Sequence, residues 1–216
     1  MTYARKIVAE AAGTALLLAA IVGSGIMGER LSDGNVAIAL LANALATGAM
    51  LVAIILAFGG ISGAHLNPVV TLAFASQKGR WEEVPGYLAA QVVGAFAGVA
   101  AAHLMFGEPI FSASQHVRSG AAQLFSEFVA TFGLLSIIWG CARNRSDAAP
   151  FAVGAYITAG YWFTASTALA NPAVTLARSF TNTFSGIRPV DAPGFIVAQF
   201  AGAAAATLLF RWLYRR

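Results

Sequence analysis

Two short stretches decide the fold of this chain, because each repeats the other. The first reads Asn67-Pro68-Val69-Val70-Thr71-Leu72-Ala73, and the second reads Asn171-Pro172-Ala173-Val174-Thr175-Leu176-Ala177. Six of their seven positions are identical. Asparagine is a strong helix N-cap, and proline is favoured at the first helical position, where its missing N–H costs nothing. Each stretch therefore predicts a helix that begins at its Asn-Pro.

Further matches extend the repeat over the rest of the chain. At one constant offset, Pro85-Gly86-Tyr87, Gln91 and Gly94 correspond to Pro193-Gly194-Phe195, Gln199 and Gly202. Glu10 corresponds to Glu127 in the same order of elements. Internal self-similarity on this scale indicates duplicated structural units. We interpret the chain as one domain, 1–216, built from two repeats at about 1–110 and 111–216.

The composition is that of a membrane protein. Of the 216 residues 58% are hydrophobic and 10% are charged, against about 25% charged in a typical soluble domain. This excludes a disordered chain and most soluble enzymes. The single cysteine, Cys141, excludes an intrachain disulfide. The net charge is +4, but no basic run with interleaved aromatic residues is present, so nucleic acid is not an expected partner.

Six apolar windows are long enough to cross a bilayer as helices, which takes about 20 residues each. They lie at 7–28, 35–57, 84–106, 121–141, 151–169 and 193–213. The segments 58–80 and 164–192, which hold the Asn-Pro stretches, are predicted to be half-length helices. Because each repeat has an odd number of spans, the second is inserted upside down, and the two half-helices meet at mid-membrane. Paired interrupted segments of this kind indicate a transport site there.

The basic residues predict the orientation. If both termini lie in the cytoplasm, nine of the 13 Lys and Arg residues lie there too. They are Arg5, Lys6, Lys78, Arg80, Arg143, Arg145, Arg211, Arg215 and Arg216. Such an excess is typical of cytoplasmic loops. We expect an integral, multi-pass protein of a bacterial inner (plasma) membrane, with the lipid bilayer as a partner.

At these residues the sequence resembles the aquaporin family, also called the major intrinsic proteins. The resemblance is carried by Ser62-Gly63-Ala64-His65-Leu66-Asn67-Pro68, by Asn171-Pro172-Ala173, and by the two glutamates within spans. It implies an all-α, right-handed bundle of six transmembrane helices plus two re-entrant half-helices, assembled as a homotetramer with one pore per subunit. It also implies passive flow of water and small uncharged solutes. The implied pore-centre residues are Asn67, Pro68, Val69, Asn171, Pro172 and Ala173.

The chain departs from that family at the narrow selectivity filter. Water channels of the family carry an arginine three residues after the second asparagine, and here that residue is Val174. Counting from the two motifs places Thr47, Ala159 and Ala168 at the other filter positions. None of the four is large or charged, so we predict a wide and weakly polar constriction. Arg178 lies one helical turn beyond Val174, about 6 Å further out, and is predicted to guard the outer vestibule.

Replacement of the filter arginine by valine is similar to a bacterial subgroup of aquaglyceroporin-like channels associated with arsenic resistance. We therefore expect a channel for metalloid hydroxides such as arsenous acid, for polyols such as glycerol, and for water. A water-selective aquaporin is the alternative. A secondary transporter with inverted repeats is a further alternative, although such proteins usually carry ionisable residues at the substrate site.

The remaining polar residues are interpreted as support. Glu10 and Glu127 could couple transport to protons, but their matched positions favour hydrogen bonds to backbone N–H groups of the re-entrant loops. His65 is predicted to fix its loop. Gly60-Ile61-Ser62-Gly63 matches a motif of rhomboid proteases, but no histidine that could act as base follows His116. We expect no enzyme activity, no cofactor and no metal.

Overall fold

The computed structural model describes residues 1–215 and is built from helices joined by short connections. Arg216, which the sequence assigned to the cytoplasmic side, lies outside the described residues. The longer helices are α1 (Tyr3–Leu31), α2 (Val36–Ser62), α4 (Val84–Phe106), α5 (Ala121–Asn144), α6 (Ala149–Phe163) and α8 (Ala192–Leu213). The shorter ones are α3 (Pro68–Lys78) and α7 (Pro172–Arg178), and two single turns are η1 (Trp81–Glu83) and η2 (Ser146–Ala148).

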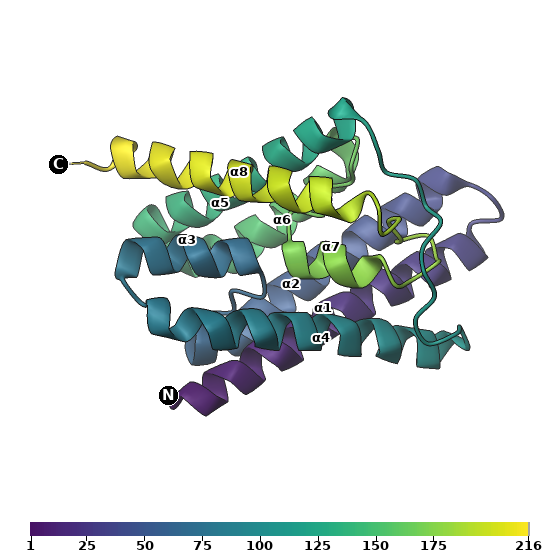
Figure 1. Ribbon diagram of the computed structural model, residues 1–216, viewed down its shortest axis with the longest axis horizontal. Coiled ribbons are helices and arrows are strands. Elements are labelled where there is room, and N and C mark those ends of the chain that lie inside the picture. Colours follow the sequence, from purple (N-terminus) through teal and green to yellow (C-terminus); the bar gives the residue numbers. More distant parts are fainter. Residues whose placement is uncertain (216) are drawn as a thin grey trace.

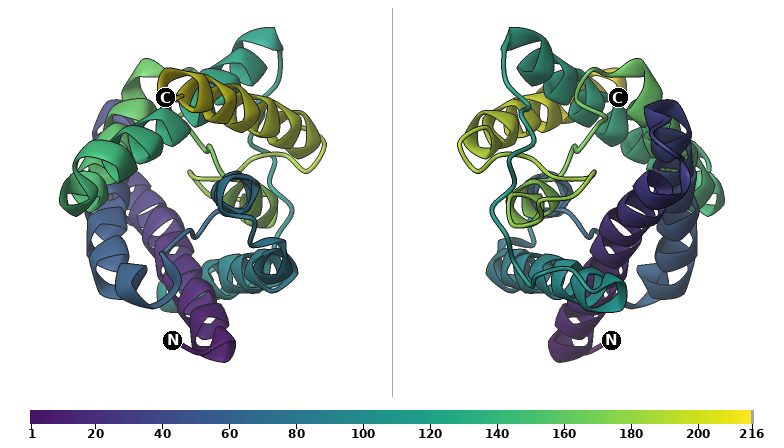
Figure 2. Two further views of the ribbon diagram at one scale, coloured as in Figure 1. Left: turned by 90° about the vertical axis from the view of Figure 1, so that its left-hand side faces the viewer. Right: turned by 90° about the vertical axis from the view of Figure 1, so that its right-hand side faces the viewer.

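The longer helices form a ring around the two short ones. Figure 1 shows both chain termini at one end of the bundle, with the connection 107–120 running across the opposite end. Viewed along the bundle in Figure 2, α3 and α7 lie one behind the other inside the ring. Helix α4 packs against α1, and α8 packs in the same way against α5. The predicted arrangement of six longer helices and two half-helices is therefore present.

The sixth span is shorter than the sequence predicts. Five described helices are long and apolar enough to cross a membrane, but α6 has only 15 residues, or about 22 Å of helix. The window 151–169 predicted that residues 164–169 continue the helix. The chain instead leaves α6 at Phe163 and adopts left-handed backbone at Thr167 (φ 61°) and Ala168 (φ 50°). That backbone turns the chain back toward the centre of the bundle.

Repeated glycines allow the helix pairs to approach closely. A Cβ atom at Gly94 would collide with the carbonyl oxygen of Ala11, where α4 crosses α1. A Cβ atom at Gly202 would collide in the same way with the carbonyl oxygen of Phe128, where α8 crosses α5. Small residues at such crossings are the usual device of membrane helix packing. The repeat seen in the sequence therefore corresponds to two equivalent helix crossings.

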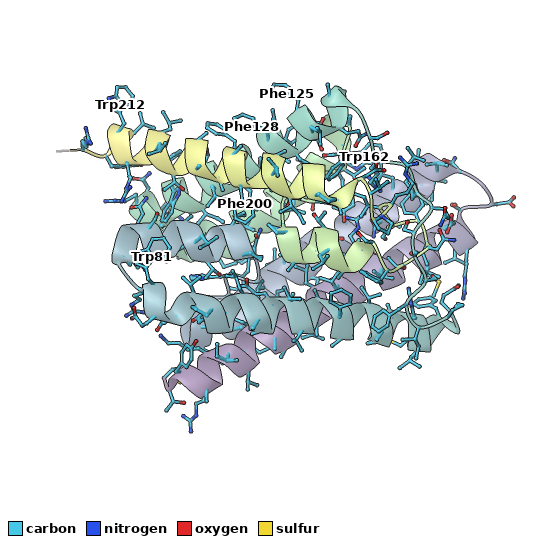
Figure 3. The ribbon with its side chains drawn as sticks, viewed as in Figure 1. Trp81, Phe125, Phe128, Trp162, Phe200 and Trp212 are labelled. Atoms are coloured by element: carbon cyan, nitrogen blue, oxygen red, sulfur yellow. The ribbon has the colours of Figure 1, made fainter. Side chains whose placement is uncertain are left out.

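The outside of the ring is apolar and aromatic. Figure 3 shows Trp81 and Trp212 toward the end that holds the termini, and Trp162 beyond the middle of the bundle, toward the opposite end. Their exposed fractions range from 49% for Trp162 to 67% for Trp212. Aromatic side chains at two levels are typical of the two bilayer interfaces. With the long apolar helices, they identify an integral, multi-pass membrane protein.

Candidate functional site

One cavity, which we call the main cavity because it contains both Asn-Pro asparagines, lies between the two Asn-Pro loops and the ring of helices. Its volume is about 220 Å³. One wall is apolar and comes from the long helices, and the other is formed by the backbone and side chains of the two loops. The wall residues from the long helices include Leu17, Ile21, Leu51, Ile55, Leu134, Ile138, Val153 and Ile157, and those from the loops include Ala64, His65, Leu66, Asn67, Ala168, Leu169, Ala170 and Asn171.

Each half-helix begins at its Asn-Pro, which confirms the predicted caps. The side chain of Asn67 accepts a hydrogen bond from the N–H of Val69 (3.1 Å), and Asn171 caps α7 in the same way. Each amide also reaches across to the other loop. Nδ2 of Asn67 donates to the carbonyl of Ala170 (2.8 Å), and Nδ2 of Asn171 donates to the carbonyl of Leu66 (2.8 Å). The two loops are thus joined at the middle of the cavity.

Both loops hold a strained backbone. Ala64 (φ 46°) and Leu66 (φ 52°) are left-handed in the first loop, and Ala168 (φ 50°) and Ala170 (φ 49°) are left-handed in the second. A non-glycine residue in this region costs about 1–3 kcal/mol and persists only where its surroundings hold it. The conformation that brings the loop atoms to the cavity wall therefore needs support from neighbouring side chains.

Glu10 supplies that support to the first loop. Its carboxylate is fully buried. It accepts hydrogen bonds from Ser62 Oγ (2.6 Å), the N–H of His65 (2.9 Å), the N–H of Leu66 (2.7 Å) and Gln91 Nε2 (2.8 Å). Hydrogen bonds to an ionised acceptor are about twice as strong as neutral ones. The buried carboxylate is therefore occupied by the loop and not presented to the cavity.

Glu127 does the same for the second loop. It accepts hydrogen bonds from the N–H groups of Leu169 (2.9 Å) and Ala170 (2.9 Å), and from Gln199 Nε2 (2.6 Å). Gln199 also donates to Thr175 (2.8 Å). The same glutamine-to-threonine bond joins the corresponding residues of the first half. The residues that match in sequence thus form matching hydrogen-bond networks.

Three of the four predicted filter residues line the main cavity, namely Thr47, Ala168 and Val174. Ala159 does not, because its side chain is exposed on the outer face of α6. The cavity is lined instead by Tyr161, which is 3% exposed and whose Oη lies 3.1 Å from Thr47 Oγ1. Residues two apart on a helix face nearly opposite sides. The count back from Asn171 was therefore wrong by two residues, and it assigned Ala159 to the cavity where the structure has Tyr161.

Tyr161 in place of Ala159 changes the expected character of the constriction. Tyr161 is large and carries a hydroxyl, so this section of the cavity is narrower and more polar than four small residues would make it. The pair of hydroxyls comes from α2 and α6, whereas Val174 comes from α7. The sequence alone does not identify Tyr161 as a cavity residue, because the count from Asn171 depends on where α6 ends.

Arg178 closes α7 on the side away from the chain termini. Its side chain is 2% exposed, and its Nε donates to the carbonyl of Ser185. It lines both the main cavity and a second cavity of about 210 Å³, which we call the outer cavity because it lies beneath the connection 107–120, at the end of the bundle opposite the termini. Arg178 therefore lies between the section at Val174 and the outer cavity.

His65 packs into the first loop. Its Nδ1 lies 3.2 Å from Thr71 Oγ1, and its ring stacks on Phe74 at a centroid distance of 4.8 Å. The residue also contributes to the wall of the main cavity. Within residues 1–215, no group of three or more His, Cys, Asp or Glu side chains is arranged to hold a metal ion.

A ring of membrane-spanning helices around a cavity, joined at mid-depth by two cross-bonded Asn-Pro loops, defines a membrane channel. The family model "Major intrinsic protein" matches residues 1–169. The chain is 56% identical to the aquaglyceroporin AqpS of Rhizobium meliloti (strain 1021), over 97% of this chain and 90% of that one. It is 35% identical to the aquaporin NIP1-3 of Oryza sativa subsp. japonica, over 96% of this chain and 74% of that one. The chain belongs to the major intrinsic protein family.

A solved structure agrees with this fold. The X-ray structure of the aquaglyceroporin from Plasmodium falciparum matches with a TM-score of 0.74 and covers 99% of this chain and 96% of that one. The sequences are 22% identical, so the likeness concerns the fold alone. The predicted aquaporin-like fold is confirmed, and the chain is a passive channel for small solutes.

Proposed function

We propose that this channel conducts small uncharged, hydroxyl-bearing solutes: metalloid hydroxides such as arsenous acid, polyols such as glycerol, and water. The observation that carries the proposal is the aliphatic side chain of Val174 in the cavity wall, where water channels of the family carry an arginine. An arginine there would fill the section and present a fixed charge. Valine leaves room for a solute, and the hydroxyls of Thr47 and Tyr161 are available to it.

The wall of the cavity suits such solutes. Hydroxyl groups would bond along the loop side, where Asn67 and Asn171 each keep a second amide hydrogen beyond the one that joins the loops. Carbon atoms would slide along the apolar side formed by Leu51, Val153 and Ile157. Asn67 and Asn171 would hold the solute at the pore centre, flanked by Pro68, Val69, Pro172 and Ala173.

The relatives support the same solute class. The name aquaglyceroporin, carried by the relative at 56% identity, denotes a channel for water and glycerol. Arsenous acid is uncharged at neutral pH and presents hydroxyls on a compact body, as glycerol does. A constriction wide enough for glycerol is therefore also wide enough for arsenous acid.

The proposal extends to the domain organisation, the assembly and the membrane orientation of the chain. The chain would be one channel domain, 1–216, made of inverted repeats, and would form a homotetramer in a bacterial inner membrane. The end that holds both termini would face the cytoplasm, because most basic residues lie there. Glu10, Glu127 and His65 would act as loop supports, with no proton coupling, no enzyme activity and no cofactor.

The test is stopped-flow light scattering on proteoliposomes. Shrinkage in sucrose reports water flux, and swelling in glycerol or arsenous acid reports solute flux. We expect both, with no saturation at millimolar solute and no response to an ion gradient. Water flux without solute flux would identify a water-selective aquaporin instead. Saturation together with a dependence on an ion gradient would identify a secondary transporter.

A further inference from the structure

The connection 107–120 carries one arginine into the interior. The segment runs across the end of the bundle opposite the termini (Figure 1), yet the side chain of Arg118 is only 8% exposed. Its Nε donates to the carbonyl of Gly186 (2.8 Å), and its Nη1 donates to the carbonyl of Ser166 (3.0 Å) and to Thr167 Oγ1 (3.3 Å). The guanidinium is therefore held in a fixed place by the segments on either side of α7.

Arg118 and Arg178 line the same space. Both contribute to the wall of the outer cavity, together with His116, Gln123 and Thr167. Within residues 1–215, neither guanidinium forms an ion pair with a carboxylate. The outer cavity is thus bordered by two positive charges that are hydrogen-bonded but not neutralised.

The acids near Arg118 and Arg178 do not pair with them. The charge of Glu127 acts on Arg118, but its carboxylate is bonded to the second loop and to Gln199. Asp191 accepts a hydrogen bond from the backbone N–H of Arg118 (2.9 Å), but its carboxylate is paired with Arg188 through two bonds of 2.9 and 3.1 Å. Burial lowers the pKa of Arg118 to about 9, and the charge of Arg178 contributes to the same shift. Arg118 remains protonated at neutral pH.

Two such charges matter because of where they lie. At an effective dielectric constant of about 20, a unit charge is repelled by another at 4 Å with about 4 kcal/mol. A cation entering the outer cavity would meet two guanidinium groups before it reached Val174. A neutral hydroxyl-bearing solute meets no such repulsion and can accept hydrogen bonds from the same groups.

We infer that Arg118 is a specificity-determining residue of the outer mouth. Arg118 and Arg178 form a pair of positive charges that excludes cations, including hydronium. This pair supplies, outside the constriction, the positive charge that is missing at Val174. This rests on the proposed function, since it explains how a channel that admits polyols stays closed to ions.

The experiment compares Arg118→Gln with wild type in proteoliposomes. Proton and K⁺ leak are measured with a pH-sensitive dye and a K⁺-sensitive dye under an imposed potential, and glycerol swelling is measured in parallel. The glutamine side chain would keep a donor near the carbonyl of Ser166 but remove the charge. We expect the leak to rise about tenfold or more, while glycerol flux stays within about twofold. Arg118→Lys, which keeps the charge, is expected to leak little.

Two further variants control for charge and for folding. Arg30→Met removes an arginine in the last turn of α1 that is paired with Glu108 and lines neither cavity, and we expect it to leave the leak unchanged. Gln123→Glu puts a negative charge in the outer cavity while leaving Arg118 and its hydrogen bonds in place, and we expect it to raise the leak. This second variant keeps the inference testable if Arg118→Gln does not fold.

The inference is overturned if folded variants at position 118 or 123 pass glycerol and leak no more than wild type. It is also overturned if Arg30→Met leaks as much as Arg118→Gln, because the effect would then be general surface charge. A wild type that passes no glycerol would instead contradict the proposed function, so the two failures are distinguishable.

Discussion

The two re-entrant loops, 62–67 and 166–171, reach nearly the same shape with different help. Both are held by one buried glutamate and joined by one asparagine amide each. The first loop is completed by side chains of its own half, from Ser62 and from Tyr87, whose hydroxyl donates to the carbonyl of Ser62 (2.8 Å). The second is completed by Arg118 from the connection 107–120, whose Nη1 donates to the carbonyl of Ser166 (3.0 Å). The internal repeat thus accounts for the support that the two loops share, whereas only the second loop, 166–171, is held by a charged side chain from the connection 107–120.

The largest expected effect comes from removing the shared support. Glu10→Leu removes the acceptor of four hydrogen bonds from buried or half-buried donors, and Glu127→Leu removes the acceptor of three. Each unsatisfied donor costs about 1–3 kcal/mol. We expect the free energy of unfolding of both variants to fall by several kcal/mol, with the larger fall for Glu10→Leu. Thermal melting in detergent, followed by size-exclusion chromatography, measures this.

Glu29→Leu is the matched control, because Glu29 lies on the same helix as Glu10 but is exposed. It should melt like wild type. If Glu127→Leu were more damaging than Glu10→Leu, the count of donors would be the wrong measure of the support.

A smaller effect is expected at the repeated helix crossings. Gly94→Ala and Gly202→Ala would each push a methyl group against a backbone carbonyl of the facing helix. Overpacking of this kind costs about 1–3 kcal/mol, and we expect similar losses because the two crossings are equivalent. The same melting assay compares them.

Gly60→Ala serves as the control, since a Cβ atom there meets no heavy atom within 4 Å. Alanine is the better helix former by about 1 kcal/mol, so this variant should be slightly stabilised. Equal melting of all three variants would remove the argument for close packing at Gly94 and Gly202.

The smallest expected effects distinguish a hydroxyl that supports the first loop from one that lines the main cavity. Tyr87→Phe removes the hydroxyl that holds the first loop, and Tyr161→Phe removes one that lines the main cavity. A lost hydrogen bond costs about 1 kcal/mol. We expect Tyr87→Phe to lower stability and leave glycerol flux unchanged. Tyr161→Phe should change glycerol flux by a few-fold, as swelling rates would show.

The central parts of the site could be predicted from the sequence because their signals are local. An Asn-Pro pair fixes a helix start wherever it lies, so Asn67 and Asn171 were found with their roles as caps. Glu10 and Glu127 stood out as charges within apolar spans. Their repetition at matched positions indicated loop support before any contact was known.

Other parts depend on geometry over longer distances. Placing Ala159 in the filter required counting through a span whose end was set by left-handed backbone at Thr167 and Ala168, which no hydrophobic pattern shows. Arg118 lies in a connection without helical periodicity, and nothing in its neighbours predicts that its side chain turns inward. Such residues are positioned by tertiary contacts alone.

The central claim is that Val174 makes this channel permeable to solutes. The most direct measurement compares glycerol, arsenous acid and water flux in proteoliposomes of wild type, Val174→Arg and Val190→Arg. Val190 is 76% exposed and lines neither cavity, so the last variant adds the same charge elsewhere. We predict that Val174→Arg lowers both solute fluxes about tenfold or more and spares water, while Val190→Arg matches wild type. Unchanged solute flux in a folded Val174→Arg channel would contradict the account.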